Sequence, residues 1–208
     1  MHAIVAKGDA PAVKPVIDTL PSRHGHFLLE SGYHTDLWLT LDALFVDPAA
    51  LVPYVAALAD RLRAHAPTAI CGPLLGGAFL AQAIATSLGA RFFVTEPAPA
   101  APAAAPAALF AAKYRLPPGQ LAHVRGERVA VVDDVLSAGS SVRATIAALE
   151  DAGATIAAAG ALLVLGDVGR THLAARCIPV EALGHRPFVL WAAADCPHCR
   201  DGIPLERP

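Results

Sequence analysis

The chain has 208 residues, 55% of them hydrophobic and 16% charged, with a formal net charge of -2 at neutral pH. This length fits one domain with a full core, and the near-neutral charge argues against a nucleic-acid partner. No uninterrupted apolar run is long enough to cross a bilayer, and the first residues lack the pattern of a secretion signal. We therefore expect a cytoplasmic protein with no membrane partner.

The first predicted helix begins at Asp47 and Pro48, because an aspartate caps free amides and proline fits the first helical turn. Apolar residues follow at helical spacing and predict one buried face: Leu51, Val55, Leu58 and Leu62. A strand over residues 68–72, a helix over 78–88 and a strand over 91–95 come next.

The same alternation continues to the end of the chain. We expect a helix over residues 140–152, a strand over 156–165, and shorter strands near Val180 and Phe188. Strands that alternate with helices predict an α/β fold with a doubly wound, mainly parallel sheet.

One motif, residues 133–141, follows an apolar and largely β-branched strand over residues 129–132. Asp133 and Asp134 lie at the carboxyl end of that strand, where open α/β sheets bind ligands. The small residues behind them allow backbone amides to close around an anion at a helix start: Ser137, Ala138, Gly139, Ser140 and Ser141. A phosphate in this loop and sugar hydroxyls on the acids would together describe a ribose 5-phosphate.

A second loop, residues 72–77, lies between the preceding strand and helix and is rich in glycine. Its backbone amides can face the same ligand edge of the sheet. The residues expected to present those amides are Leu74, Leu75, Gly76 and Gly77.

The regular pattern lapses over residues 96–127. Residues 97–108 are only proline and alanine, which predicts a semi-stiff exposed linker. Aromatic and basic residues follow it: Phe110, Lys113, Tyr114, Arg115 and His123. This segment is either a solvated surface hairpin or a mobile lid that carries cations to a phosphate-rich site.

The cysteines fall into two groups. We expect Cys71 and Cys177 to be buried spacers. Cys196 and Cys199 frame a Cys-Pro-His-Cys sequence, which supplies half of a structural zinc site, and no second cysteine pair exists. The intervening His198 would add a ligand only with strain. Packed thiols, a metal site, which a dimer could share, and a redox pair stay open for these two cysteines.

The 133–141 motif resembles the phosphoribosyl-diphosphate signature of the type I phosphoribosyltransferases. The resemblance implies that Asp133 and Asp134 contact the ribose hydroxyls, that residues 137–141 hold the 5′-phosphate, and that residues 74–77 hold the pyrophosphate. It implies Mg²⁺ bound through the ligand, with Lys113 and Arg115 neutralising pyrophosphate when the lid closes.

The resemblance also implies one domain over residues 1–208 with a small hood over the sheet. The hood comprises an N-terminal segment, 1–46, and a C-terminal tail, 185–208, and the mobile loop spans 96–127. In this family the lid commonly serves the neighbouring subunit, which implies a homodimer.

The N-terminal segment resembles the orotate phosphoribosyltransferases, and implies that Ser31, Gly32 and Trp38 bind the base. Many of those enzymes have lysine where this chain has Glu30, and an Asp-Arg pair where it has residues 165–167. The expected reaction is therefore transfer of phosphoribosyl to a base, most simply orotate. A transferase for another base and a non-catalytic sensor of phosphoribosyl diphosphate stay open.

Overall fold

A six-stranded sheet forms the centre of the molecule in the order β5-β4-β3-β6-β7-β8. The computed structural model describes residues 20–99 and 109–208, so most of the proline- and alanine-rich stretch lies outside the described residues. The strands are β3 (Ala69–Pro73), β4 (Arg91–Pro97), β5 (Tyr114–Arg115), β6 (Arg128–Leu136), β7 (Thr155–Leu165) and β8 (Val180–Arg186). All neighbours are parallel except β4 and β5, which confirms the predicted mainly parallel sheet. The strand predicted near Phe188 is wrong, because β8 ends at Arg186.

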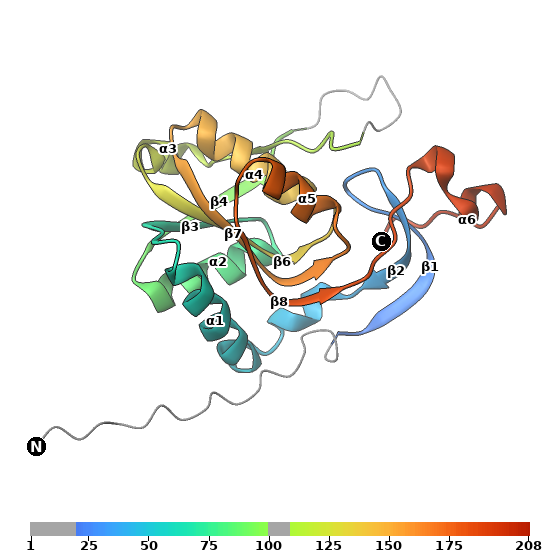
Figure 1. Ribbon diagram of the computed structural model, residues 1–208, viewed down its shortest axis with the longest axis horizontal. Coiled ribbons are helices and arrows are strands. Elements are labelled where there is room, and N and C mark those ends of the chain that lie inside the picture. Colours follow the sequence, from blue (N-terminus) through green and yellow to red (C-terminus); the bar gives the residue numbers. More distant parts are fainter. Residues whose placement is uncertain (1–19, 100–108) are drawn as a thin grey trace, which may run out of the picture.

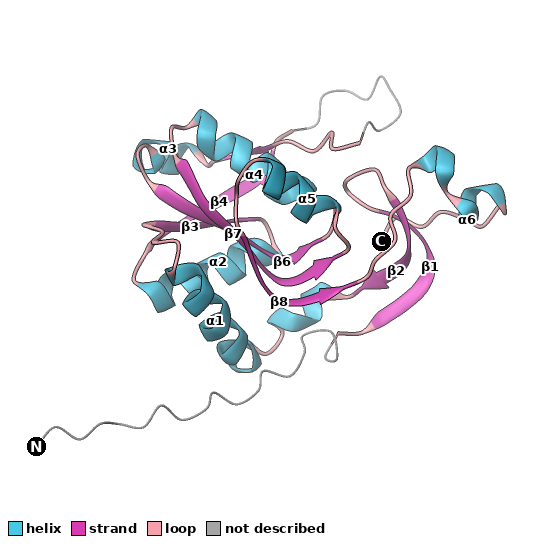
Figure 2. Cartoon of the chain, in the orientation of Figure 1, coloured by secondary structure: helices cyan, strands magenta, loops and turns pink. Residues whose placement is uncertain are grey.

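Helices cover both faces of this sheet, as Figures 1 and 2 show. On one face lie α1 (Pro48–Arg63) and α2 (Gly76–Leu88); on the other lie α3 (Pro118–Val124), α4 (Ser140–Asp151) and α5 (Val168–Ala175). Each face has its own apolar core, so the sheet is buried on both sides. This burial explains why the strands are almost uniformly apolar. Within the described ranges, no helix is long and apolar enough to span a membrane.

The helix ends follow their sequence signals. The Asp47 carboxylate accepts hydrogen bonds from the Ala49 and Ala50 amides, which caps α1 as predicted. The buried face of α1 contains all four predicted apolar residues. Gly89, directly after α2, has a φ of 66°, a left-handed conformation that glycine adopts without strain.

The chain order reverses between β3 and β6. From β3 the chain moves outward to β4, whereas β6, β7 and β8 extend the sheet in the opposite direction. The loops after β3 and β6 therefore lead to helices on opposite faces and leave a crevice at the carboxyl ends of these two strands. Such a switch point is where open α/β sheets bind ligands.

Near this edge, a hairpin of β1 (Ser22–Leu28) and β2 (His34–Leu39) packs with the C-terminal tail. The tail includes the short helix α6 (Pro197–Arg200). The Leu28 amide donates to the Glu206 carbonyl at 2.9 Å, and the His34 amide donates to the Trp191 carbonyl at 2.8 Å. We call this unit of hairpin and tail the hood; it joins segments far apart in sequence (Figure 1).

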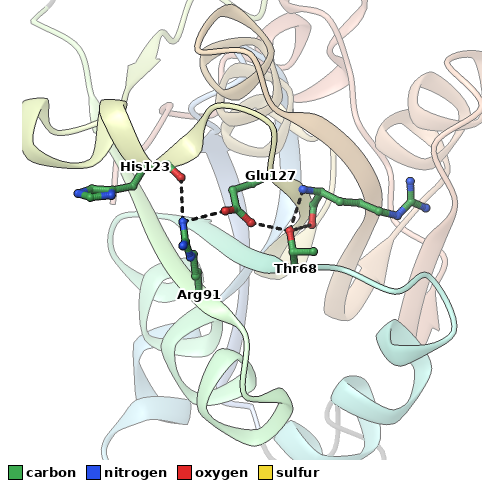
Figure 3. A network of polar contacts seen from close by, with 5 residues as sticks. Thr68, Arg91, His123 and Glu127 are labelled. Carbon is green, nitrogen blue, oxygen red and sulfur yellow. Dashed lines mark hydrogen bonds and ion pairs between the residues drawn. The ribbon is translucent and has the colours of Figure 1, made fainter.

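At the opposite edge, a polar network ties together the starts of β3, β4 and β6 (Figure 3). The Glu127 carboxylate accepts from Thr68 Oγ1 at 2.5 Å and from Arg91 Nη1 at 2.9 Å. The Thr68 hydroxyl oxygen also accepts from the Arg128 amide at 2.9 Å. Glu127 is 15% exposed, so its carboxylate depends on these partners more than a solvated one would.

We predict that Glu127→Ala lowers the free energy of unfolding by about 1–2 kcal/mol, because it removes a mostly buried acceptor with two donors. The measurement is urea denaturation followed by circular dichroism. Asp60→Ala is the matched control, since the Asp60–Arg63 pair is exposed on both sides and should contribute little. If both variants lowered the free energy of unfolding by the same amount, the Glu127 network would contribute no more to stability than an exposed ion pair, and the prediction would be wrong.

Candidate active site

The two adjacent acids lie at the carboxyl end of β6 and are held there by short hydrogen bonds. Asp133 is 7% exposed; its carboxylate accepts from Ser141 Oγ at 2.7 Å and from the Asp134 amide at 3.1 Å. One oxygen of Asp134 accepts from the Val135 amide at 2.7 Å. These contacts fix both carboxyl groups at the switch point, where a bound sugar would meet them.

The loop after these acids has the features of an anion site. Gly139 has a φ of 80° and leads directly into α4, so the first amides of this helix lie at the end of the loop. The buried hydroxyls of Ser137 and Ser140 have no hydrogen-bond partner among the described residues. Buried hydroxyls without partners are costly, and a ligand oxygen would satisfy them. The helix dipole also favours an anion here.

The glycine-rich loop after β3 lies directly against the two acids. A side-chain carbon on Gly77 would lie 2.8 Å from Asp133 Oδ1, and one on Gly76 would clash with Asp134 Oδ2. Only glycine permits this approach of backbone to carboxylate. The Leu74–Leu75 peptide bond is cis, and the side chains of Leu74 and Leu75 are exposed. Two loops predicted separately from the sequence therefore meet at one place.

A cavity of about 550 Å³ lies between the acids and the hood. Its walls include both aspartates, residues 137–141, and Ser31 and Trp38 from the hood. Gly32 is not part of the wall; with a φ of 84°, it shapes the turn between β1 and β2. The sequence-predicted sugar site and most of the predicted base site thus face one cavity of a size that suits a small-molecule ligand.

A family model described as the phosphoribosyl transferase domain matches residues 49–174, which is more than half of the chain. The chain belongs to the phosphoribosyl transferase family. The curated orotate phosphoribosyltransferase of Thermotoga maritima is 30% identical over 188 residues, covering 88% of this chain and 89% of the relative. That of Caldanaerobacter subterraneus is 29% identical, covering 88% of each.

Solved structures support the same fold. Orotate phosphoribosyltransferase from Aeropyrum pernix aligns with a TM-score of 0.59 and 22% identity, covering 79% of this chain and 87% of that one. Adenine phosphoribosyltransferase from Rhodothermus marinus aligns with a TM-score of 0.66 and 20% identity, covering 86% of this chain and all of the other. The expected family is confirmed, and the protein is a phosphoribosyltransferase enzyme.

The cavity of this phosphoribosyltransferase is strongly acidic. Burial raises the pKa of the Asp133 carboxyl well above its usual range, and the neighbouring Asp134 charge raises it further. Burial also raises the pKa of Asp134, with a smaller contribution from Asp42. Glu30 and Asp42 line the cavity as well, and none of its described lining residues is a lysine or arginine. A diphosphate ligand would need cations from elsewhere.

The predicted lid cations do not line this cavity. Arg115 lies in β5 and forms an ion pair with Glu96 at 2.9 Å, while Lys113 is exposed. The Tyr114 hydroxyl between them donates to Glu30 at 2.9 Å. This contact joins the 96–127 segment to the hood, as does the bond from the Phe110 amide to the Ser31 carbonyl at 2.9 Å.

Sequence reasoning missed several residues at the site. Asp42, Phe188 and Pro208 line the cavity, but no local pattern marks them, because their role depends on how the hood folds over the sheet. The guanidinium of Arg143, on α4, lies 3.8 Å from the ring centre of Phe110. Arg143 does not line the cavity, and its contact with Phe110 joins α4 to the 96–127 segment.

We predict that Asp133→Asn stabilises the free protein at neutral and higher pH. The pKa of the Asp133 carboxyl is higher in the folded protein than in the unfolded chain. Ionising this carboxyl therefore costs more in the folded state, and the resulting loss of stability grows as pH rises from the unfolded pKa to the folded pKa. The melting temperature of Asp133→Asn should exceed that of the wild type by a few degrees at pH 8, since about 1 kcal/mol corresponds to roughly 2–4 °C at this size. The difference should shrink as pH falls.

Differential scanning fluorimetry between pH 5 and pH 8 provides the measurement. Asp167→Asn is the control, because Asp167 is largely exposed and paired only at the surface. If the melting temperature of Asp133→Asn were at or below the wild-type value at every pH, the buried Asp133 carboxylate would not destabilise the folded protein and the prediction would be refuted.

Proposed function

We propose that this enzyme transfers phosphoribosyl from 5-phosphoribosyl 1-diphosphate to orotate, giving orotidine 5′-monophosphate and pyrophosphate. The observation that supports orotate is the name shared by curated relatives about 30% identical over 88% of the chain. The fold neighbours include orotate and adenine enzymes, so the fold supports the transfer but leaves the base open.

The reaction displaces pyrophosphate from the anomeric carbon of the sugar by a ring nitrogen of the base. Positive charge develops on the sugar and negative charge on the leaving group, so positioning and electrostatics supply the catalysis. In this proposal Asp133 and Asp134 accept hydrogen bonds from the ribose hydroxyls and favour the cationic sugar. The amides at the start of α4, with Ser137 and Ser140, hold the 5′-phosphate.

The oxygen donors of the site suit Mg²⁺, a hard cation that prefers carboxylate, hydroxyl, phosphate and water oxygens. Asp133 and Asp134 would hold it through the ribose hydroxyls or through water, and the ion would neutralise charge on the diphosphate. Their raised pKa values fit this role, because a pair of buried carboxylates is relieved by a cation more than by a neutral ligand.

The acidic cavity also supports a lid supplied in trans. We propose that Lys113 and Arg115 act at the site of a second subunit in a homodimer, because neither lines the cavity of its own chain. Lys113 is exposed and forms no ion pair within the described residues, whereas Arg115 is paired with Glu96. Lys113 is therefore better placed than Arg115 to reach the diphosphate of a second subunit.

One observation favours an acceptor base other than orotate. Glu30, in the β1–β2 turn of the hood, lines the cavity, and its carboxylate would repel the carboxylate of orotate. A base without a negative charge would avoid this repulsion. The protein would then be a phosphoribosyltransferase for a purine or a modified pyrimidine, with the same sugar donor.

The deciding experiment is a panel of bases incubated with 5-phosphoribosyl 1-diphosphate and Mg²⁺, with nucleotide product measured by chromatography. Orotate should give the highest kcat/KM. Turnover with another base but not with orotate would refute the acceptor and leave the donor site standing. An Asp133→Asn/Asp134→Asn double variant that bound the diphosphate as well as the wild type would refute the donor site itself.

We predict that Lys113→Ala lowers kcat by about 10²-fold or more, the usual cost of removing one stabilising charge from a transition state. Arg115→Ala should cost less, because Glu96 already neutralises that side chain. Steady-state kinetics at saturating diphosphate provides the measurement, and equal effects from the two variants would contradict the assignment.

Coexpression tests the shared site directly. Lys113→Ala and Asp133→Asn/Asp134→Asn subunits should regain about a quarter of wild-type activity together, because half of random dimers are mixed and each mixed dimer has one intact site. Activity that stays at the level of the separate variants would show that the lid acts within its own chain.

A further inference from the structure

Four side chains in the hood, outside the proposed active site, converge on one point. They are His26 and His34 from the β1–β2 hairpin, and Cys196 and Cys199 from the tail around α6. Their nitrogen and sulfur atoms all lie within 4.8 Å of one another. We propose that these four residues bind one Zn²⁺ ion, which fastens the C-terminal tail to the N-terminal hairpin.

The distances between the donor atoms fit a tetrahedral ion. His26 Nε2 lies 2.9 Å from His34 Nδ1, 3.4 Å from Cys196 Sγ and 3.7 Å from Cys199 Sγ. Cys199 Sγ lies 3.3 Å from His34 Nδ1. In a tetrahedral site with Zn–N bonds of about 2.0–2.1 Å and Zn–S bonds of about 2.3 Å, such atoms lie about 3.3–3.8 Å apart. Three of the four distances above lie in this range. The His26–His34 distance is shorter and no donor pair is more than 4.8 Å apart, so small shifts of the rings and thiols would complete this geometry.

The surroundings prepare His26 to act as a ligand. Its Nδ1 lies 2.8 Å from the Ile203 carbonyl oxygen, which can only accept a hydrogen bond. Nδ1 must therefore carry the proton of the neutral ring, which leaves the lone pair of Nε2 directed at the other three donors. A zinc-bound histidine usually has such a partner on its second nitrogen.

The donor types and their burial indicate zinc with a structural role. Two thiolates and two imidazoles in a tetrahedral set are typical ligands of Zn²⁺, whereas Mg²⁺ prefers oxygen. His26, His34 and Cys196 are buried, and Cys199 lies at the surface. Four protein ligands fill a tetrahedral ion and leave no position for substrate, so the site would not take part in phosphoribosyl transfer.

This site revises what the sequence predicted for the two cysteines. No second cysteine pair exists, and the missing ligands are histidines more than 160 residues away. Both lie on the same chain as the cysteines, so no dimer is needed to complete the set. His198, between the cysteines, is not among the four; it stacks on His26 at 5.4 Å. Cys71 is buried as predicted, but the prediction for Cys177 is wrong, because it is exposed.

A disulfide between Cys196 and Cys199 is the competing interpretation. It would use the two sulfur atoms but would give His26 and His34 no reason to converge on them. Zinc explains all four positions with one ion. The zinc proposal is tested by measuring bound metal and not by enzyme activity. Its outcome therefore does not depend on which base the enzyme uses.

The first experiment measures zinc in the purified full-length wild-type protein by inductively coupled plasma mass spectrometry, after reduction, exposure to Zn²⁺ and removal of free metal. One zinc per chain is expected. Replacement by Co²⁺ should give the visible absorption of a tetrahedral ion and a thiolate-to-cobalt charge-transfer band. Absence of stoichiometric zinc, an octahedral cobalt spectrum or an intact Cys196–Cys199 disulfide resistant to zinc would each overturn the proposal.

Variants then assign the ligands. Cys199→Ser and His34→Asn should each lower zinc retention at least 10-fold in a competition with a chelator, whereas Cys177→Ser should retain it. Cys177 is the matched control, since it is an exposed thiol outside the cluster. If Cys177→Ser lost as much zinc as Cys199→Ser and His34→Asn, the assignment of the ligands would be refuted. Chelator should also lower the melting temperature of the wild type, a test that requires no variant to fold.

Discussion

The structure depends on placing two adjacent carboxyl groups at the end of a buried central strand. Asp133 and Asp134 repel each other there, and burial increases the effect. The neighbouring loops accommodate the two carboxylates. Gly76 and Gly77 have no side chains that would clash with them, and Ser141 donates a hydrogen bond to Asp133. A sugar with two vicinal hydroxyls and an accompanying cation would satisfy what the protein alone leaves unsatisfied.

This arrangement divides recognition between two parts of the chain. The sheet edge contains the acids and the helix amides, which suit a ribose phosphate. The hood contributes Ser31, Trp38 and Glu30 to the other side of the cavity, where a base would lie. The features common to the family belong to the first part. The departures from the orotate pattern are Glu30 in the hood and residues 165–167 at the carboxyl end of β7, both on the side expected to read the base. The sugar donor is therefore more firmly supported than the acceptor.

The same division explains what could be predicted from the sequence. The α1 cap, the alternation of strands and helices, and the position of the 133–141 motif at a strand end depend on residues near one another in the chain, and the structure confirms them. The strand near Phe188 was wrong because the chain leaves the sheet after Arg186. Phe188 packs against the α1–α2 core, and Trp191 forms an isolated bridge to His34 of the hood. The convergence of His26 and His34 with Cys196 and Cys199 depends on contacts between the two chain ends, which no local spacing reveals.

Those contacts also bear on the cavity itself. The tail reaches the hairpin through main-chain bonds, the His26–Ile203 contact and an Arg23–Glu206 ion pair, and then contributes Pro208 to the cavity wall. The ion pair is half exposed and main-chain bonds at a sheet edge open easily, so these contacts alone hold the tail weakly. An ion bound by two hairpin and two tail residues would fix one against the other close to the turn that carries Ser31. Zinc would then govern the shape of the base side of the cavity without touching the substrate.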